Sequence, residues 1–109
     1  MKIRSDNKGG IPILRIEGDV DMGTSPEMKK YFDKVTAARP KEIIANLEKV
    51  DYMDSSGLAT MVEVYKVMKQ NEGIIKLVGL SDKVRGLFEI TKLDKLFKIF
   101  KSEDEALNG

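Results

Sequence analysis

The run from residue 41 to residue 47 constrains the fold more strongly than any other stretch of the sequence. Its apolar residues Ile43, Ile44 and Leu47 are nearly continuous, instead of alternating with polar ones. Continuous apolar runs are typical of strands that are covered on both faces, as the strands of parallel sheets are. We therefore expect an α/β fold in which helices cover a sheet built around this strand.

The patterns on either side of this run alternate between strands and helices. Strands are predicted at 1–7, 11–16, 41–47, 74–78 and 96–99, and helices at 24–37, 58–69 and 82–91, with a brief one from residue 102. A Lys-Gly-Gly turn between the first two strands predicts a hairpin. The order ββαβαβα(β)α indicates a single α/β domain over residues 1–109, with a mixed, mostly parallel sheet of 4–5 strands and about four helices.

Capping residues predict where three of the helices begin. Thr24, followed by Pro26, predicts that the first helix starts with a hydroxyl cap and a proline in its first turn. The segment Gly79-Leu80-Ser81-Asp82 is predicted to cap the third helix, and Ser102 with Glu105 has the pattern of a capping box. The spacing i, i+3, i+4 and i+7 predicts one buried face on the first helix, which consists of Met28, Tyr31, Phe32 and Val35.

Two adjacent serines lie between the apolar strand and the longest helical pattern. The sequence there is Asp54-Ser55-Ser56-Gly57. A Ser or Asp before a helix is the preferred N-cap, because its side-chain oxygen accepts a hydrogen bond from a free N–H group of the first turn. Gly57 has no side chain and would let a partner's backbone or a phosphate approach closely, or would simply be small beside a packed loop. Position alone is compatible with a simple capped helix and with a functional site.

Three loops are expected to meet at one edge of the predicted sheet. Short right-handed crossovers place the carboxyl ends of parallel strands at the same edge, so the loops at 21–24, 54–57 and 80–82 should lie close together. In open α/β sheets, ligands and partners bind at this edge. Asp21 and Asp54 in these loops have two interpretations, which are turn chemistry and a role in a partner interface.

Composition excludes several kinds of function. The chain has no Cys and no His, which rules out a disulfide framework, a zinc site of the usual type and a Ser-His-Asp triad. The formal net charge is +1 and the Lys residues are scattered, unlike the concentrated basic face of nucleic-acid-binding domains. No apolar run approaches the length of a membrane span, and the first residues do not form a signal peptide. We therefore expect a cytoplasmic protein without a cofactor, a metal, direct nucleic-acid binding or membrane association.

Three segments, at residues 18–21, 53–58 and 84–91, together resemble the STAS domain, and in particular bacterial anti-sigma-factor antagonists. The run Met-Asp-Ser-Ser-Gly-Leu at 53–58 is similar to the signature of that family. Residues 18–21 are similar to its Gly-acid-apolar-Asp turn, and residues 84–91 to its helix before the last strand. The resemblance extends from about residue 11 to residue 100. Ala59 departs from the family pattern, in which many members have Gly, and leaves the serines unaffected.

The resemblance implies a partner switch in transcription regulation, of the kind found in stress responses and sporulation. The unphosphorylated antagonist would bind an anti-sigma factor that is also a serine protein kinase, and the captured sigma factor would be released. The kinase would then phosphorylate the antagonist with ATP, and a serine phosphatase would reset the switch. In that family the serine directly after the Asp accepts the phosphate, which implies Ser55 here, with Ser56 as the substitute. The protein itself would not be an enzyme, and we expect a monomer in the free form.

The resemblance also implies a partner-binding surface around the serines. Its expected members are Asp21, Met22, Thr24, Asp54, Ser55, Ser56, Gly57, Leu58 and Ser81. For Leu58 the pattern leaves a place in the core as an alternative. A phosphate on Ser55 is expected to be held by the free N–H groups and the dipole of the following helix, so that the fold survives modification.

Two other functions are alternatives to the phosphorylation switch. A non-phosphorylated STAS adaptor, as a subunit of a lipid-transport complex or of a stress-signalling assembly, also fits the resemblance. It would take up no phosphate from ATP and candidate kinases, which separates it from the switch. A hydrolase with Ser56 as its nucleophile lacks a His and any Lys at an obvious base spacing, so the residues disfavour it.

Overall fold

One mixed sheet of five strands organises the structure, a computed structural model that describes all residues from Met1 to Gly109. The strands are β1 (Lys2–Lys8), β2 (Ile11–Glu17), β3 (Glu42–Lys49), β4 (Ile74–Val78) and β5 (Lys98–Phe100), and they lie side by side in chain order. The helices are α1 (Ser25–Thr36), α2 (Ser55–Gln70), α3 (Asp82–Ile90) and α4 (Glu103–Asn108), with a 3-10 turn, η1 (Leu93–Lys95), before β5. The predicted α/β architecture and its order ββαβαβα(β)α are confirmed.

A tight turn joins β1 to β2, and longer connections join the remaining strands. Gly9 and Gly10 both have positive φ, 60° and 84°, as the type I′ turns of two-residue hairpins require. β1 therefore runs antiparallel to β2, as predicted, whereas β2 to β5 are parallel to their neighbours. Because each parallel pair needs a crossover, the carboxyl ends of β2, β3 and β4 lie at one edge of the sheet.

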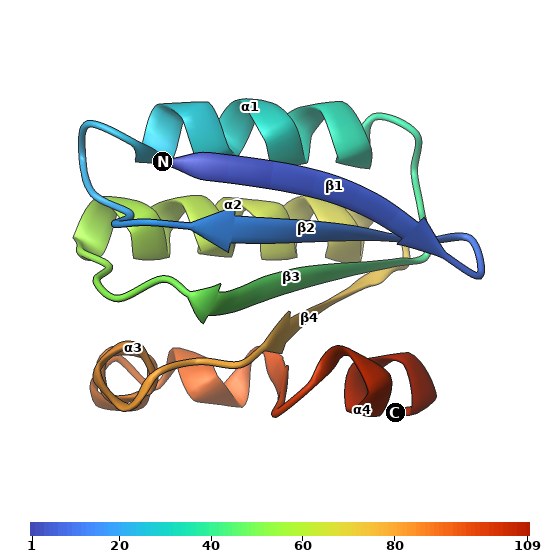
Figure 1. Cartoon of the computed structure of the whole chain (residues 1–109). Coiled ribbons are helices and arrows are strands. Elements are labelled where there is room, and N and C mark those ends of the chain that lie inside the picture. Colours follow the sequence, from blue (N-terminus) through green and yellow to red (C-terminus); the bar gives the residue numbers. More distant parts are fainter.

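Alternate residues of β3 face two different layers. Ile43, Ala45 and Leu47 are fully buried in the main core, together with residues of α1 and α2. These two helices lie next to each other along one face of the sheet (Figure 1). Ile44 points to the opposite face, into a small apolar cluster that includes Ala106 of α4. The prediction that this strand is covered on both faces is confirmed.

Polar contacts attach α4 to the sheet. Near the start of the helix, the carboxylate of Glu103 accepts hydrogen bonds from Arg15 Nε at 2.8 Å and from Asn46 Nδ2 at 2.7 Å. Near its end, the buried ammonium of Lys76 donates to the carbonyl oxygen of Ala106 at 2.7 Å. A helix of only six residues is thereby fixed at both ends.

The buried face of α1 is narrower than the sequence pattern predicts. Met28 and Phe32 are fully buried, but Tyr31 is 40% exposed. Met28 and Phe32 lie one turn apart and directly above each other, so they form the line that contacts the sheet, with Tyr31 to one side of it. The prediction that Tyr31 is a core residue is therefore wrong.

The C-terminal part differs from the predictions in two details. β5 begins at residue 98, not 96, because the N–H of Leu96 still closes the 3-10 turn by donating to the carbonyl oxygen of Leu93. Ser102 caps α4 as predicted, since its hydroxyl accepts the N–H of Glu105 at 3.2 Å. The carboxylate of Glu105, however, accepts the N–H of Lys101 instead of that of Ser102, so the capping box is displaced by one residue.

Candidate functional site

The loops that follow β2 and β3 are bonded to each other at the carboxyl edge of the sheet. Val20 and Met53 form an isolated parallel bridge. The N–H of Val20 donates to the carbonyl oxygen of Tyr52 at 2.9 Å, and the N–H of Asp54 donates to the carbonyl oxygen of Val20 at 3.0 Å. Two of the three loops that the sequence predicted at this edge therefore meet.

Asp54, and not a serine, caps α2. Its Oδ1 accepts hydrogen bonds from the N–H groups of Ser56 and Gly57 at 2.9 and 3.2 Å, so the helix begins at Ser55 and not at residue 58 as predicted. Its Oδ2 accepts the N–H of Met22 at 3.2 Å, which fastens the neighbouring loop to the same carboxylate. These hydrogen bonds, led by one from the Ser56 side chain, lower the pKa of Asp54.

The two serines have different environments although they are adjacent. The hydroxyl of Ser56 donates a hydrogen bond to Asp54 Oδ1 at 2.5 Å, and this residue is partly buried. Ser55 is exposed, and its hydroxyl has no hydrogen-bond partner within the chain. Of the two residues, only Ser55 presents an unbonded hydroxyl at the surface.

Gly57 and Leu58 belong to the core. A Cβ atom on Gly57 would lie 2.7 Å from Cγ of Met53 and 2.8 Å from Cγ1 of Val20. The glycine is thus required by the close contact between α2 and the two loops, and not by the approach of a partner. Leu58 is only 7% exposed and lies in the main core, which agrees with the second interpretation of this residue. Neither residue is available at the surface where the resemblance placed it.

Asp21 and Thr24 build the loop at residues 21–24. Asp21 Oδ1 accepts the N–H groups of Gly23 and Thr24 at 2.9 and 3.1 Å, which is the turn chemistry that one interpretation gave it. Thr24 lies directly before α1, but its hydroxyl does not cap the helix as predicted, because backbone groups of the loop bind it. It donates to the carbonyl oxygen of Asp19 at 2.8 Å and accepts the N–H of Asp21 at 2.9 Å. The loop therefore holds Met22 at its tip, with 78% of the residue exposed.

Ser81 is not joined to the other site residues. Its hydroxyl caps α3 by accepting the N–H of Val84 at 3.2 Å, as the sequence predicts. The turn before it contacts the end of β3, because a Cβ on Gly79 would lie 2.7 Å from Cβ of Glu48. No hydrogen bond links Ser81 to the two loops around Ser55. The third of the predicted loops thus provides the N-cap of α3.

The two joined loops around Ser55 contain acids and no cations, and they carry two exposed apolar side chains. Residues 18–27 and 50–58 contain no Lys or Arg. Their acids are Asp19, Asp21, Glu27, Asp51 and Asp54. Besides Met22, Tyr52 is 46% exposed, and the interpretation of the sequence did not include it. Neighbouring residues of an extended segment point to opposite sides, so Tyr52 is exposed because Met53 is buried. The sequence alone does not show which of the two is buried, because the bridge between Met53 and Val20 decides it.

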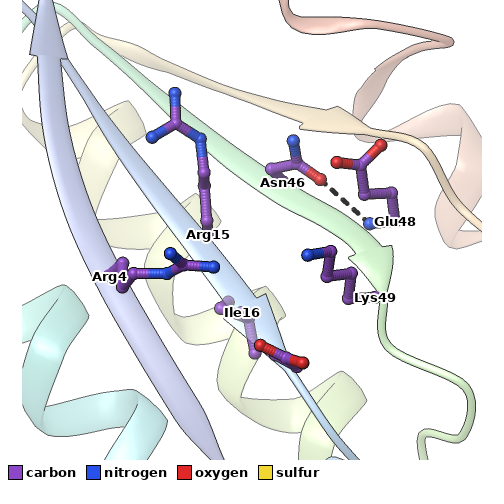
Figure 2. Close-up of a pocket in the computed structure, with 7 residues that line it drawn as sticks. Arg4, Arg15, Ile16, Asn46, Glu48 and Lys49 are labelled. Carbon is purple, nitrogen blue, oxygen red and sulfur yellow. Dashed lines mark hydrogen bonds between the residues drawn. The ribbon is translucent and has the colours of Figure 1, made fainter.

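Two hollows lie on the face of the sheet that α4 covers, and neither is lined by residues of the two joined loops. Figure 2 shows Arg4, Arg15 and Asn46 among the residues around a hollow of about 50 Å³ on β1, β2 and β3. A hollow of about 390 Å³ lies between Asn46 and the start of α4. No group of three or more acidic, His or Cys side chains is arranged to hold a metal ion. No helix combines the length and the apolar character that crossing a membrane requires.

The sequence matches known proteins over most of its length. The family model described as the STAS domain matches residues 2–106. An anti-sigma-B factor antagonist of Staphylococcus aureus (strain NCTC 8325 / PS 47) is 35% identical over 86 residues, which cover 79% of this chain and 80% of that protein.

Solved structures share the fold. An anti-sigma factor antagonist from Mycobacterium paratuberculosis has a TM-score of 0.91 at 24% identity, over 98% of this chain and 91% of that chain. The phosphorylated form of the Bacillus cell fate determinant SpoIIAA has a TM-score of 0.77 at 19% identity, over 98% of this chain and 97% of that chain. The resemblance that the serine motif and its two companion segments indicated is confirmed by the family match and by the Staphylococcus aureus relative. The chain belongs to the STAS domain family.

Proposed function

We propose that this protein is an anti-sigma-factor antagonist controlled by phosphorylation of Ser55. The unphosphorylated form binds an anti-sigma factor that is also a serine kinase, and the sigma factor is released in the cytoplasm. Phosphorylation ends the binding, and a serine phosphatase restores it. The observation that carries the proposal is the free, exposed hydroxyl of Ser55 at the joined loops, next to a second serine whose hydroxyl is bonded. The anti-sigma-B factor antagonist of Staphylococcus aureus, as a relative by sequence, supports it.

In the proposed reaction the chain supplies only the nucleophile. Ser55 Oγ attacks the γ-phosphorus of ATP, the bond from that phosphorus to the β–γ bridging oxygen breaks, and ADP leaves. The hydroxyl proton passes to a base on the kinase. Asp54 is poorly suited as this base, because both of its carboxylate oxygens already accept hydrogen bonds. The protein therefore acts as substrate and binding partner, and not as an enzyme.

The surface around Ser55 favours a partner with basic and apolar groups. Met22 and Tyr52 are exposed in the two bonded loops, in segments that contain acids and no cations. Exposed aromatic and Met side chains at the centre of an interface supply much of its affinity, while complementary charge guides association. We infer that the anti-sigma factor presents an apolar pocket for these two side chains, surrounded by Lys or Arg.

A phosphate on Ser55 would stay at the surface. Fewer N–H groups of α2 are free to hold it than the sequence suggests, because Asp54 already accepts the N–H groups of Ser56 and Gly57. Of the first three N–H groups of the helix, only that of Ser55 itself is left without a partner in the chain.

The phosphate would add about −1.5 to −2 charges that a docking partner must strip of water. A penalty of about 3 kcal/mol for this desolvation and repulsion weakens binding more than roughly a hundredfold.

Affinity capture from the native lysate tests the proposal, with Ser55→Ala and Ser55→Asp proteins as baits. We expect the Ala bait to retain an ATP-binding serine kinase and the Asp bait to lose it. Ser56→Ala is the matched control, because it changes the adjacent hydroxyl and should leave retention of the kinase intact. Tyr52→Ala tests the apolar contact, and the amount of kinase that this bait retains should fall by about tenfold or more relative to the bait with Tyr52. Identical partners on the Ala and Asp baits, or a transporter subunit in place of a kinase, would instead support an unphosphorylated adaptor.

A further inference from the structure

We propose that Asp54 directs phosphorylation to Ser55 by binding the hydroxyl of Ser56. Asp54 is in this respect a positioning residue, since it acts through Ser56 and does not touch the reacting atoms. The proposal rests on the proposed function, because it assigns the choice between two hydroxyls within the same phosphorylated motif.

The two serines are adjacent in sequence and differ in exposure and in hydrogen bonding. Both lie in the first turn of α2, directly after the capping residue. The Ser56 hydroxyl is 2.5 Å from Asp54 Oδ1, a distance typical of a strong hydrogen bond between a hydroxyl and a carboxylate. To attack a phosphorus atom, Ser56 must break this bond and rotate its oxygen towards the kinase. Ser55 needs no such step, because its exposed hydroxyl has no partner in the chain.

A competing interpretation is that Asp54 activates Ser56 as a general base. Three hydrogen bonds converge on Asp54 Oδ1, from the Ser56 N–H, the Gly57 N–H and the Ser56 hydroxyl, and a fourth reaches Oδ2 from Met22. A carboxylate that accepts so many hydrogen bonds is stabilised as the anion and is a poor proton acceptor at neutral pH. We therefore interpret the contact as a restraint on Ser56. The two interpretations predict opposite sites of phosphorylation.

Substitutions at residue 54 can release Ser56 without removing the helix. Gly is tolerated at an N-cap almost as well as the preferred polar residues, so Asp54→Gly keeps α2 and removes the acceptor for the Ser56 hydroxyl. Asn has one side-chain oxygen and caps helices well, so Asp54→Asn keeps an acceptor for Ser56 but loses the one for the Met22 N–H. Asn therefore separates the restraint on Ser56 from the attachment of the loop.

The assay incubates each full-length variant with ATP and the kinase retained by the Ser55→Ala bait, or with the native lysate if no kinase is isolated. Fragmentation mass spectrometry then gives the amount of phosphate on each serine. We expect phosphate on Ser55 in the wild type and in Asp54→Asn. In Asp54→Gly the share on Ser56 should rise by roughly tenfold to a hundredfold, which corresponds to the loss of a hydrogen bond to a charged group. Circular dichroism of each variant verifies that the fold is retained.

The possible failures are distinguishable. Phosphate on Ser55 alone in folded Asp54→Gly overturns the role of Asp54 and leaves the proposed function intact. Phosphate on Ser56 in the wild type, lost in Asp54→Gly, supports the general-base interpretation and overturns the proposal. No phosphate on either serine of the wild type contradicts the proposed function itself. Exchange of the hydroxyl protons by NMR needs no kinase: a Ser56 proton that exchanges as fast in the wild type as in Asp54→Gly would also overturn the proposal.

Discussion

At the scale of single residues, the surface around Ser55 depends on residues that are not themselves exposed contacts. Gly57 lets α2 approach Val20 and Met53, and Asp54 joins the start of the helix to the neighbouring loop. For both residues the sequence left two interpretations open, a place at the partner surface and a structural role. The structure gives Gly57 a role in packing and Asp54 a role as the cap. The exposed hydroxyl of Ser55 is the consequence of both.

Gly57→Ala is expected to lower the free energy of unfolding by about 1–3 kcal/mol, because its methyl group would overlap side chains of Met53 and Val20 in a filled core. Denaturant unfolding followed by circular dichroism measures the change. Gly86→Ala is the matched control, since a Cβ there meets no atom within 4 Å and Ala should stabilise α3 by up to about 1 kcal/mol. A Gly57→Ala protein as stable as the wild type would show that the loops can move apart at little cost.

At the scale of elements, α4 depends on polar contacts more than the other helices do. Ala106 is its only buried residue, whereas α2 buries a full apolar face. Glu103 compensates through its bonds to Arg15 and Asn46, residues from two different strands. Removing this carboxylate should therefore affect the attachment of a whole element.

The bonds of Glu103 predict a pH-dependent contribution to stability. The hydrogen bond from Arg15 is the main reason that the pKa of Glu103 falls from 4.5 to about 2 in the folded protein. Since the folded pKa is depressed, the stabilisation is complete above about pH 4.5 and disappears as the pH falls towards 2. At pH 7 we expect the free energy of unfolding of the wild type to be about 1–3 kcal/mol higher than that of Glu103→Gln. This range allows for the partial exposure of Arg15, which weakens the ion pair.

Denaturant unfolding of the wild type and Glu103→Gln, at pH 7 and at pH 3, measures this contribution. The difference between the two proteins should shrink at the lower pH. Asp104→Asn is the control in the same helix, because its carboxylate makes no hydrogen bond or ion pair and its loss should cost no more than about 0.5 kcal/mol. A difference for Glu103→Gln that is the same at both pH values would mean that its charge does not attach α4.

At the scale of the whole molecule, the proposed switch is confined to one edge of the sheet. The hydrogen bonds around Ser55 come from the loops after β2 and β3, and β4, β5 and α4 take no part in them. These loops are bonded through backbone groups, which a phosphate on an exposed hydroxyl does not disturb. Phosphorylation should thus change the binding surface and leave the fold unchanged.

Amide spectra of the phosphorylated and unphosphorylated proteins test this expectation. Chemical-shift changes should be confined to the loops at 18–27 and to residues 50–60, with β4, β5 and α4 unaffected. Ser55→Ala treated with the same kinase and ATP is the control for changes unrelated to the phosphate. Shifts spread across the sheet would mean that the switch works through a change of conformation and not through the surface.

Local patterns predicted most of the fold but only part of the site. The glycine turn at residues 9–10, the apolar run at 43–47 and the serine cap at residue 81 act within a few residues of chain, so their outcomes are as predicted. The predictions of a helix cap at Thr24 and of burial for Tyr31 were wrong, because the loop and the sheet around these residues set their environment. The motif identified the family, since three segments at their separations carry that information.

The sequence by itself determined the order of elements, the carboxyl edge at which the loops gather and the family of the chain. Only the tertiary structure decided which serine is free. That choice depends on one carboxylate shared by Ser56 and by Met22 from the loop after β2, and on a bridge between Val20 and Met53. Periodicity and caps operate between neighbours in sequence. Exposure and hydrogen-bond partners depend on segments that come together only when the sheet has formed.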